Sequence, residues 1–276
     1  EEKYQQRANS WMLMVASFGF VISTLPVQIL LPMIGWRSIF LLISILILLS
    51  IILILIFTPS WNNNTKNTIT QEKGNLSDVW KNKFFISLIP LCFLNYGGVQ
   101  AVQTLWAGPW MLNVAGYSPL DSATGLFWIN ITMLFAFMFW GYILPKFSSL
   151  GIDSIKIVKI GLPISYVVLF SIIIMGQNAG AIMFTLYILS SIVLSLTQPA
   201  LALSFPQNLA GKSLTSINVF IHSGTFFVQW GIGLLIDLSK NMGASTVTSY
   251  KISFSIFLIL CIFSYLFFIY FNKNEN

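Results

Sequence analysis

Long runs of apolar residues, separated by short polar stretches, occupy most of the chain. An α-helix needs about 20 such residues to cross the hydrocarbon core of a bilayer. On that length, the sequence predicts eight spans, at residues 11–33, 38–58, 84–107, 122–144, 160–176, 180–203, 214–236 and 251–271. Most connections are short, so neighbouring spans should be antiparallel. The exception is the polar stretch from Thr58 to Lys83, which we interpret as a linker with a short interfacial helix near Leu76–Trp80.

The spans differ in polarity. The second, fifth and eighth are almost wholly aliphatic and aromatic, so each can face lipid on most sides. The other spans after the linker carry polar residues at helical spacing, which places the members of each set on one helix face. These sets are Tyr96, Gln100 and Gln103 in the third span, Asn130 in the fourth, Ser191, Ser195 and Gln198 in the sixth, and Asn218, His222, Thr225 and Gln229 in the seventh.

Polar groups inside a bilayer need partners, because a lone one in hydrocarbon costs several kcal/mol. The side chains of these sets can therefore form hydrogen bonds between helices, and such bonds are common without any functional role. Alternatively they line a shared aqueous cavity. We expect at least some of them to line such a cavity. The candidate substrate-binding residues are Tyr96, Gln100, Gln103, Asn130, Gln198, Asn218, His222 and Gln229.

His222 is the only histidine, and an imidazole can change its charge near neutral pH. Two interpretations stay open for it. It is either a neutral group hydrogen-bonded to a neighbouring helix, or a substrate ligand or proton-responsive group in the cavity.

Composition and charge agree with a membrane location. The chain is 56% apolar and 8% charged, whereas soluble domains carry about 25% charged residues. The net charge of +6 does not indicate a nucleic-acid partner, because the basic residues lie between the apolar runs.

Eleven basic residues fall on one side of the predicted membrane and three, Arg37, Lys240 and Lys251, on the other. By the positive-inside rule, the linker and both ends of the chain should be cytoplasmic. The eleven are Lys3, Arg7, Lys66, Lys73, Lys81, Lys83, Lys146, Lys156, Lys159, Lys212 and Lys273.

The residues give little support for an enzyme. The acids lie in loops or at span ends, and Cys92 and Cys261 lie far apart inside apolar runs. We find no acid–base pair, metal cluster, phosphate loop or nucleophile elbow in the sequence. We therefore expect no catalytic residue, no metal and no cofactor. A non-transporting membrane scaffold or sensor stays open as an alternative to a transporter, and an integral membrane transferase is less favoured.

Two halves of the chain show a weak internal repeat. Aligning Arg7 with Lys212 also aligns Gly19 with Gly224, which makes the first and seventh spans equivalent. A separation of six spans is what a transporter with two six-helix repeats predicts.

Short motifs add a resemblance to a known family. They are the segment from Pro32 to Phe40 with its Gly-Trp-Arg, the segment from Leu105 to Trp110 followed by Val114–Tyr117, and the segment from Phe205 to Lys212. With these, the chain resembles the major facilitator superfamily, whose two six-helix halves are joined by a long cytoplasmic linker. Its third, sixth, ninth and twelfth helices are peripheral. The stretch from Gly141 to Gly151 departs from the family's signature loop, because it lacks the expected Asp and Arg.

The resemblance implies an all-α integral membrane bundle with eight transmembrane helices. Residues 1–58 would be the last two helices of the N-terminal half, residues 59–83 the cytoplasmic linker, and residues 84–276 the complete C-terminal six-helix half. We expect a fragment that lacks the first four helices, since the first residue is Glu1 and not Met.

The implied function is secondary active transport of a small solute by alternating access. The implied place is a bacterial inner membrane. The expected partners are the solute, with or without a coupling proton, and the lipid bilayer. No nucleic acid and no obligate protein partner are expected.

Overall fold

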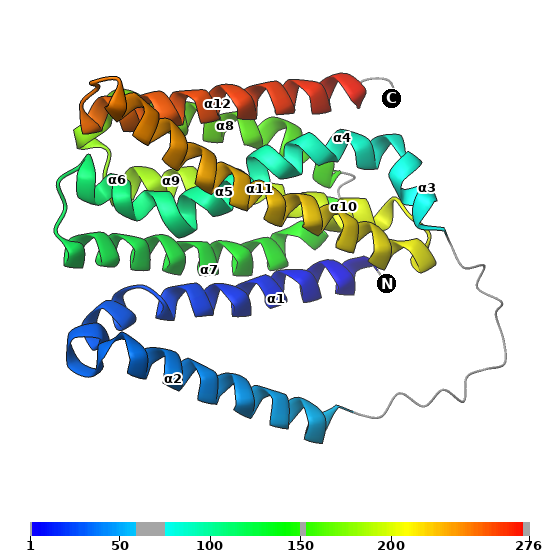
Figure 1. Cartoon of the computed structure of the whole chain (residues 1–276). Helices are drawn as coiled ribbons and strands as arrows, with labels where there is room; N and C mark the ends of the chain where they lie inside the picture. The colour runs from blue at the N-terminus through cyan, green and yellow to red at the C-terminus, as the bar shows by residue number, and fades with distance from the viewer. Residues whose placement is uncertain (1, 59–74, 150–152, 273–276) are drawn as a thin grey trace.

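The computed structural model describes residues 2–58, 75–149 and 153–272, and within these ranges every regular element is helical (Figure 1). Before the linker lie α1 (Glu2–Ile22) and α2 (Leu25–Phe57), and after it α3 (Leu76–Lys81). One long irregular helix follows, made of α4 (Lys83–Leu91), η1 (Cys92–Tyr96), α5 (Gly97–Ala101), η2 (Val102–Trp106) and α6 (Ala107–Asn113). The remaining elements are α7 (Pro119–Ser149), α8 (Ser154–Met175), η3 (Gly176–Asn178), α9 (Ala181–Ser191), η4 (Ile192–Leu196), α10 (Thr197–Leu203), α11 (Gln207–Asn241) and α12 (Thr246–Phe271).

Helices long and apolar enough to cross a membrane make up most of the described chain. There are seven in the described ranges: Leu25–Phe57, Lys83–Asn113, Pro119–Ile143, Ser154–Asn178, Ala181–Leu203, Gln207–Asn241 and Thr246–Phe271. The protein is therefore a multi-pass integral membrane bundle. Of the eight predicted spans, the first alone has no counterpart among these seven. The helix at its place is α1. The first half of α1 contains Glu2, Lys3 and Arg7 and is too polar for α1 to count as a membrane-spanning helix.

The first predicted span is not one continuous helix. The sequence predicts a span at residues 11–33, but α1 ends at Ile22 and a turn at Ser23 and Thr24 separates it from α2. The two turn hydroxyls donate to the carbonyl oxygens of Phe20 and Val21 at 2.8 Å, which satisfies groups that the end of the helix leaves open. Hydropathy does not reveal this turn, because the residues around it are apolar.

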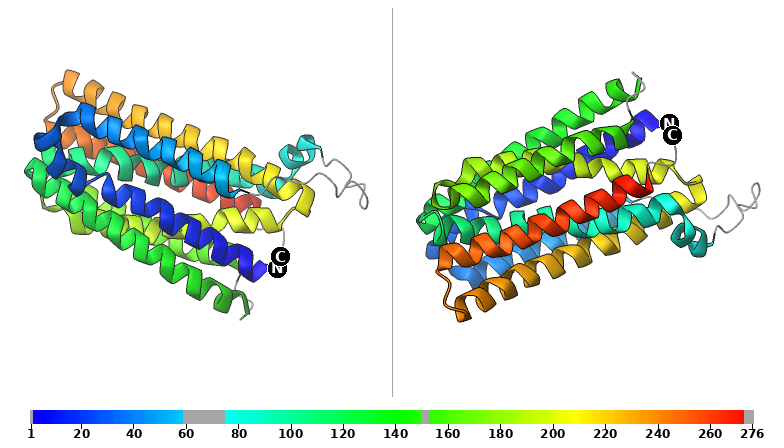
Figure 2. Two further views of the ribbon diagram at one scale, coloured as in Figure 1. Left: turned by 90° about the horizontal axis from the view of Figure 1, so that it is seen from below. Right: turned by 90° about the horizontal axis from the view of Figure 1, so that it is seen from above.

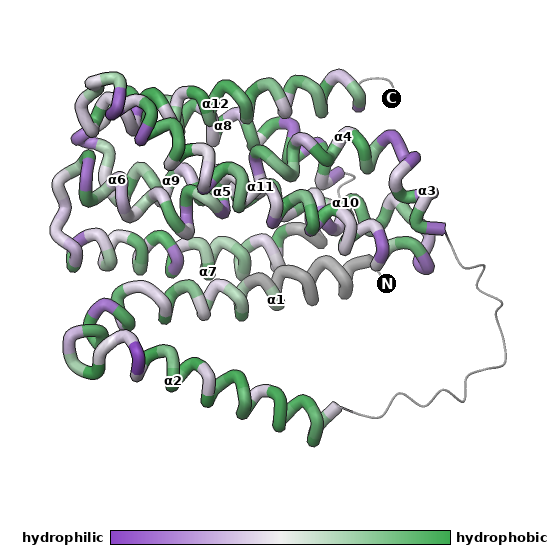
Figure 3. The backbone as a smooth tube through the Cα atoms, viewed as in Figure 1, coloured by the Kyte–Doolittle hydropathy of each residue, from purple (hydrophilic) through white to green (hydrophobic). Residues whose placement is uncertain are grey.

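The predicted break near residue 35 is a kink inside α2. Gly35 has φ of 73° and ψ of 161°, which is outside the helical region. A residue without a Cβ adopts such a positive φ at little cost. As a result, α2 has two limbs, and the limb after Gly35 is hydrophobic along most of its length (Figure 3).

The predicted plain spans lie at the edges of the bundle. In Figure 1, α2 occupies one edge of the bundle, and α8 and α12 lie at the opposite edge; seen from below in Figure 2, α2 (light blue) lies in front of the other helices. No residue of α2 is buried in the described chain. On α8, apolar side chains such as Ile160, Ile164 and Val167 are exposed along one face, as expected for a helix that faces lipid.

Two glycines, Gly97 and Gly224, let α11 pack closely against η1 and α5. A Cβ added at Gly97 would lie 2.6 Å from the carbonyl oxygen of Ile221, and one at Gly224 would lie 2.0 Å from that of Phe93. Small residues at such crossings allow backbones to approach closely, a common device in membrane proteins. This seam fixes α11 against the irregular helix that carries the candidate site.

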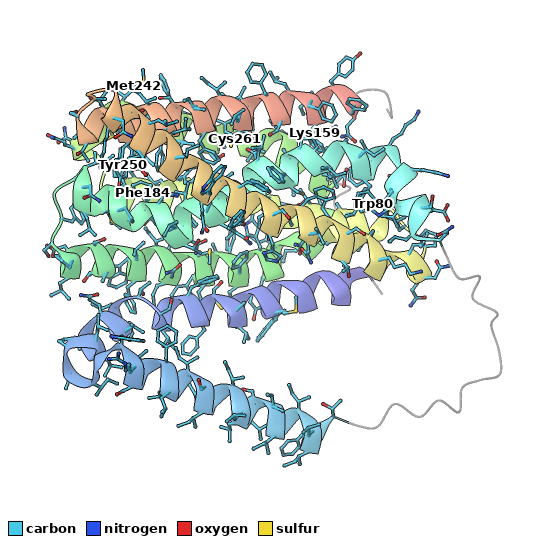
Figure 4. All side chains as sticks on the ribbon, in the orientation of Figure 1. Trp80, Lys159, Phe184, Met242, Tyr250 and Cys261 are labelled. Atoms are coloured by element: carbon cyan, nitrogen blue, oxygen red, sulfur yellow. The ribbon has the colours of Figure 1, made fainter. Side chains whose placement is uncertain are left out.

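The short helix predicted near Leu76–Trp80 is present as α3. Within α3, the side chain of Val79 is fully buried. The ring of Trp80 lies 5.7 Å from that of Phe85 and 5.6 Å from that of Phe220. Trp80 is labelled at this end of the bundle in Figure 4. The contacts hold the end of the linker against α4 and α11.

Candidate functional site

Departures from α-helical geometry gather near the middle of two spans. The helix from Lys83 to Asn113 contains two π-helical segments, η1 and η2, on either side of α5. The helix from Ala181 to Leu203 contains the 3₁₀ segment η4. Such interruptions often mark functional sites or hinges.

A pocket opens where these irregular segments face α1 and α7. It encloses about 580 Å³ of space free of atoms, counting its open mouth. The described lining residues come from four spans: Ala16, Ser17, Phe20, Tyr96, Val99, Gln100, Gln103, Met133, Phe137, Ile188, Ser191, Ile192 and Ser195.

The polar set of the third predicted span lies together in this pocket. Tyr96, Gln100 and Gln103 all line it, so the helical spacing placed them correctly on one face. The carboxamide oxygen of Gln100 accepts a hydrogen bond from Thr225 at 3.1 Å. The carboxamide nitrogen of Gln103 donates to Oδ1 of Asn130 at 2.8 Å and contacts the Met133 sulfur at 3.3 Å.

A second pocket adjoins the first on the side of the α1–α2 turn. It encloses about 810 Å³ and shares Phe20 and Gln103 with the first pocket. Its other described lining residues are Ser23, Thr24, Val27, Gln28, Thr104, Ala123, Leu126 and Asn130. Asn130 therefore lines this pocket and not the first.

A chain of hydrogen bonds runs between the two pockets. Gln103 donates to Asn130, and the amide nitrogen of Asn130 donates to the carbonyl oxygen of Phe20 at 3.4 Å. These bonds join η2, α7 and α1, three elements that come from both sides of the linker. They form a polar connection across the space between the pockets.

The remaining candidates lie beside the first pocket, along α10 and α11. Gln198 donates to Oδ1 of Asn218 at 2.9 Å, and Gln229 donates to the Thr104 hydroxyl at 3.0 Å. His222 is exposed on the same side of α11, and no hydrogen bond to it is found in the described part of the chain. None of these four candidates is among the described residues that line either pocket.

The sequence pattern did not single out any residue of α1 as a candidate for substrate binding. Ala16, Ser17 and Phe20 line the pocket, and Ser17 is buried. In the sequence, Ser17 is a single small hydroxyl in an apolar run, a signal too common in membrane helices to single out. Only the packing of α1 against α7 brings it to the site.

A separate buried network was also missed. Asn95, in η1, donates to the Ser264 hydroxyl at 2.7 Å and accepts from the Tyr166 hydroxyl at 2.8 Å. It joins η1 to α8 and α12, away from both pockets. Its groups satisfy one another, which suits a structural role.

The pocket can hold and orient a small molecule. Its described lining contains hydroxyl and carboxamide groups beside apolar and aromatic side chains, which is the usual make-up of a ligand site. Among the residues the structure describes, no group of three or more His, Cys, Asp or Glu could hold a metal ion.

Most of the chain matches a known protein family. Residues 1–229 match the family described as Major Facilitator Superfamily, which is more than four-fifths of the chain. No curated protein matches the chain.

Proposed function

Because the chain belongs to the major facilitator superfamily and is a membrane transporter, we propose that it moves a small solute by alternating access through the first pocket. Transport by this mechanism needs a site near the middle of the bilayer, between two bodies that rock against each other. The proposed bodies are residues 1–58 and residues 84–276, with residues 59–83 as the linker. In the family's order, these correspond to helices five and six and helices seven to twelve.

The position of the pocket carries this proposal. Its lining comes from α1, before the linker, and from three spans after the linker. Tyr96, Met133 and Ile192 each lie near the middle of their spans, so the pocket lies at mid-depth. A solute bound there would touch both proposed bodies, and their relative motion would change its access to each side.

The hydrogen bonds from Gln103 to Asn130 and from Asn130 to Phe20 supply a closing contact for this motion. They join the two proposed bodies between the first pocket and the second. We propose that these bonds break when the second pocket opens into the first. The candidates Gln198, Asn218, His222 and Gln229 would then contact the solute along its route, outside the pocket described above.

Transport in reconstituted vesicles tests the proposal. The substitution Val99→Trp fills the pocket, and Val167→Trp makes the same change on the exposed face of α8 as a matched control. We expect uptake of at least one small solute by vesicles with the unaltered chain or with Val167→Trp, and its loss with Val99→Trp. Equal uptake in both variants would contradict a route through this pocket.

Orientation in the membrane is a separate part of the proposal. We propose that the linker and the C-terminus face the cytoplasm of a bacterial cell, on the basis of eleven basic residues against three. A cysteine introduced by Asn64→Cys should react with a membrane-impermeant reagent only after the cells are opened. The native Cys92 and Cys261 are both buried, which keeps background labelling low. Labelling of this cysteine from outside intact cells would show that the orientation is the opposite of the proposed one.

A coupling proton would need a side chain that can bind and release it. His222, near the middle of α11, is the only histidine of the chain. If the transport is coupled to protons through it, His222→Gln should abolish the effect of a pH gradient on uptake. Unchanged dependence on the gradient would remove His222 from the coupling.

A further inference from the structure

We infer that the solute of the first pocket is uncharged and amphipathic, with an apolar body and a hydrogen-bonding group such as a carboxamide or hydroxyl. This inference rests on the proposal that the first pocket is the solute site. It names the chemical class that the pocket would accept.

Charge is the first observation. None of the described lining residues of the pocket is an acid or a base. In the helices around it, charged side chains lie towards the ends: Asp121 in the first turn of α7, Lys240 in the last turn of α11 and Lys251 in the second turn of α12. His222 is exposed on α11 and does not line the pocket. A charged solute would lose its hydration without gaining an opposite charge, and desolvation then dominates.

Unused hydrogen-bonding groups are the second observation. In the described chain, no hydrogen bond is found for the Tyr96 hydroxyl, the carboxamide nitrogen of Gln100 or the carboxamide oxygen of Gln103. All three residues line the pocket. They offer a donor, an acceptor and a hydroxyl that can act as either. A neutral group with both a donor and an acceptor complements this set, whereas a carboxylate has no donor and an ammonium no acceptor.

The apolar part of the wall is the third observation. Phe20, Val99, Phe137, Ile188 and Ile192 face the same space as the two glutamines. Binding there gains from removing apolar surface from water, at about 25 cal/mol per Å². A fully polar solute such as a sugar would bury its hydroxyls against this wall without partners. The combination of an apolar wall, an unused amide nitrogen of Gln100 and an unused amide oxygen of Gln103 fits an amphipathic solute.

The test compares three probes that share one apolar body. They are biphenyl carboxamide, biphenyl carboxylate and biphenylmethylammonium, measured by equilibrium dialysis against the purified full chain in nanodiscs of zwitterionic lipid. Empty nanodiscs correct for partition into lipid. We expect the carboxamide to bind at least about tenfold more tightly than either charged probe, and Val99→Trp to weaken it at least about tenfold. Equal or tighter binding of a charged probe would overturn the inference, as would the absence of carboxamide binding.

A charge placed in the pocket provides the second arm. Gln100→Glu keeps the oxygen that accepts from Thr225 and adds a negative charge to the wall. Gln177→Glu makes the same change on the exposed turn after α8 and serves as the control. We expect Gln100→Glu to move the preference at least about tenfold towards biphenylmethylammonium, and Gln177→Glu to leave the order unchanged. An unchanged order in Gln100→Glu would show that the probes bind elsewhere and would overturn the inference.

Failure of this inference can be told apart from failure of the proposed function. If vesicles take up a charged solute and Val99→Trp abolishes this uptake, the pocket is the transport site but the inferred class of solute is wrong. Selective carboxamide binding without uptake of any solute would keep the class and overturn the transport function.

Discussion

Replacing Gly224 by alanine adds one methyl group where α11 crosses the helix that carries the pocket. The new Cβ would lie 2.0 Å from the carbonyl oxygen of Phe93 and 2.8 Å from its Cα atom. Ordinary contact begins near 3.4 Å, so the two backbones must separate by about 3.4 − 2.0 = 1.4 Å. Backbone atoms cannot rotate away as a flexible side chain could. The crossing itself therefore has to open.

The expected cost follows from three contributions. Alanine is favoured over glycine inside a helix by about 1 kcal/mol. Overpacking of a close contact costs about 1–3 kcal/mol. Opening the seam also strains the bond from Thr225 to Gln100, which contributes about 1 kcal/mol. We expect a net loss of about 2 kcal/mol, or roughly 4–8 °C in the apparent unfolding midpoint for a chain of this size.

The chain contains its own reporters for this measurement. Cys92 and Cys261 are free thiols, and both are buried. A fluorogenic thiol reagent therefore reacts when the bundle opens, and a temperature ramp in detergent gives the midpoint. Gly231→Ala is the matched control, because it lies in the same helix and a Cβ there would meet nothing within 4 Å.

We expect Gly231→Ala to leave the midpoint unchanged or slightly higher, and Gly224→Ala to lower it. The same reasoning predicts a loss for Gly97→Ala, whose Cβ would lie 2.6 Å from the Ile221 oxygen. If Gly224→Ala is as stable as Gly231→Ala, the close crossing of η1 and α11 is wrong.

Three further predictions concern polar side chains. Asn95→Leu should lower the midpoint by roughly 2–12 °C in the same assay, because the buried hydroxyl of Tyr166 then loses its acceptor at 2.8 Å, at a cost of about 1–3 kcal/mol; an unchanged midpoint would refute the network. Asn130→Ala removes the bonds between the pockets, so a cysteine introduced by Val99→Cys in the first pocket should react faster with a small reagent added outside than it does with Asn130 intact. Equal rates would show that these bonds do not limit access. His222→Gln should shift the midpoint by less than about 2 °C, since an exposed side chain without a described partner contributes within about 0.5 kcal/mol; a larger fall would reveal a structural role.

The sequence alone was sufficient for the class of protein and most of its spans. A bilayer demands about 20 apolar residues per crossing, so hydropathy locates helices such as α8 and α12 directly. Helical spacing also placed Tyr96, Gln100 and Gln103 on one face, as the pocket shows. The family resemblance, drawn from short motifs, is confirmed by the match over residues 1–229.

Only the tertiary structure decided which polar faces meet. Spacing along one helix fixes the direction of its side chains but not the neighbour they reach, so Gln198 and Asn218 could be predicted to share a space yet not to bond each other. The turn at Ser23 and Thr24 escaped notice because two side-chain bonds replace the helical ones there without changing hydropathy. The contribution of Ser17 required α1 to pack against α7, a contact between residues far apart in sequence that no local pattern encodes.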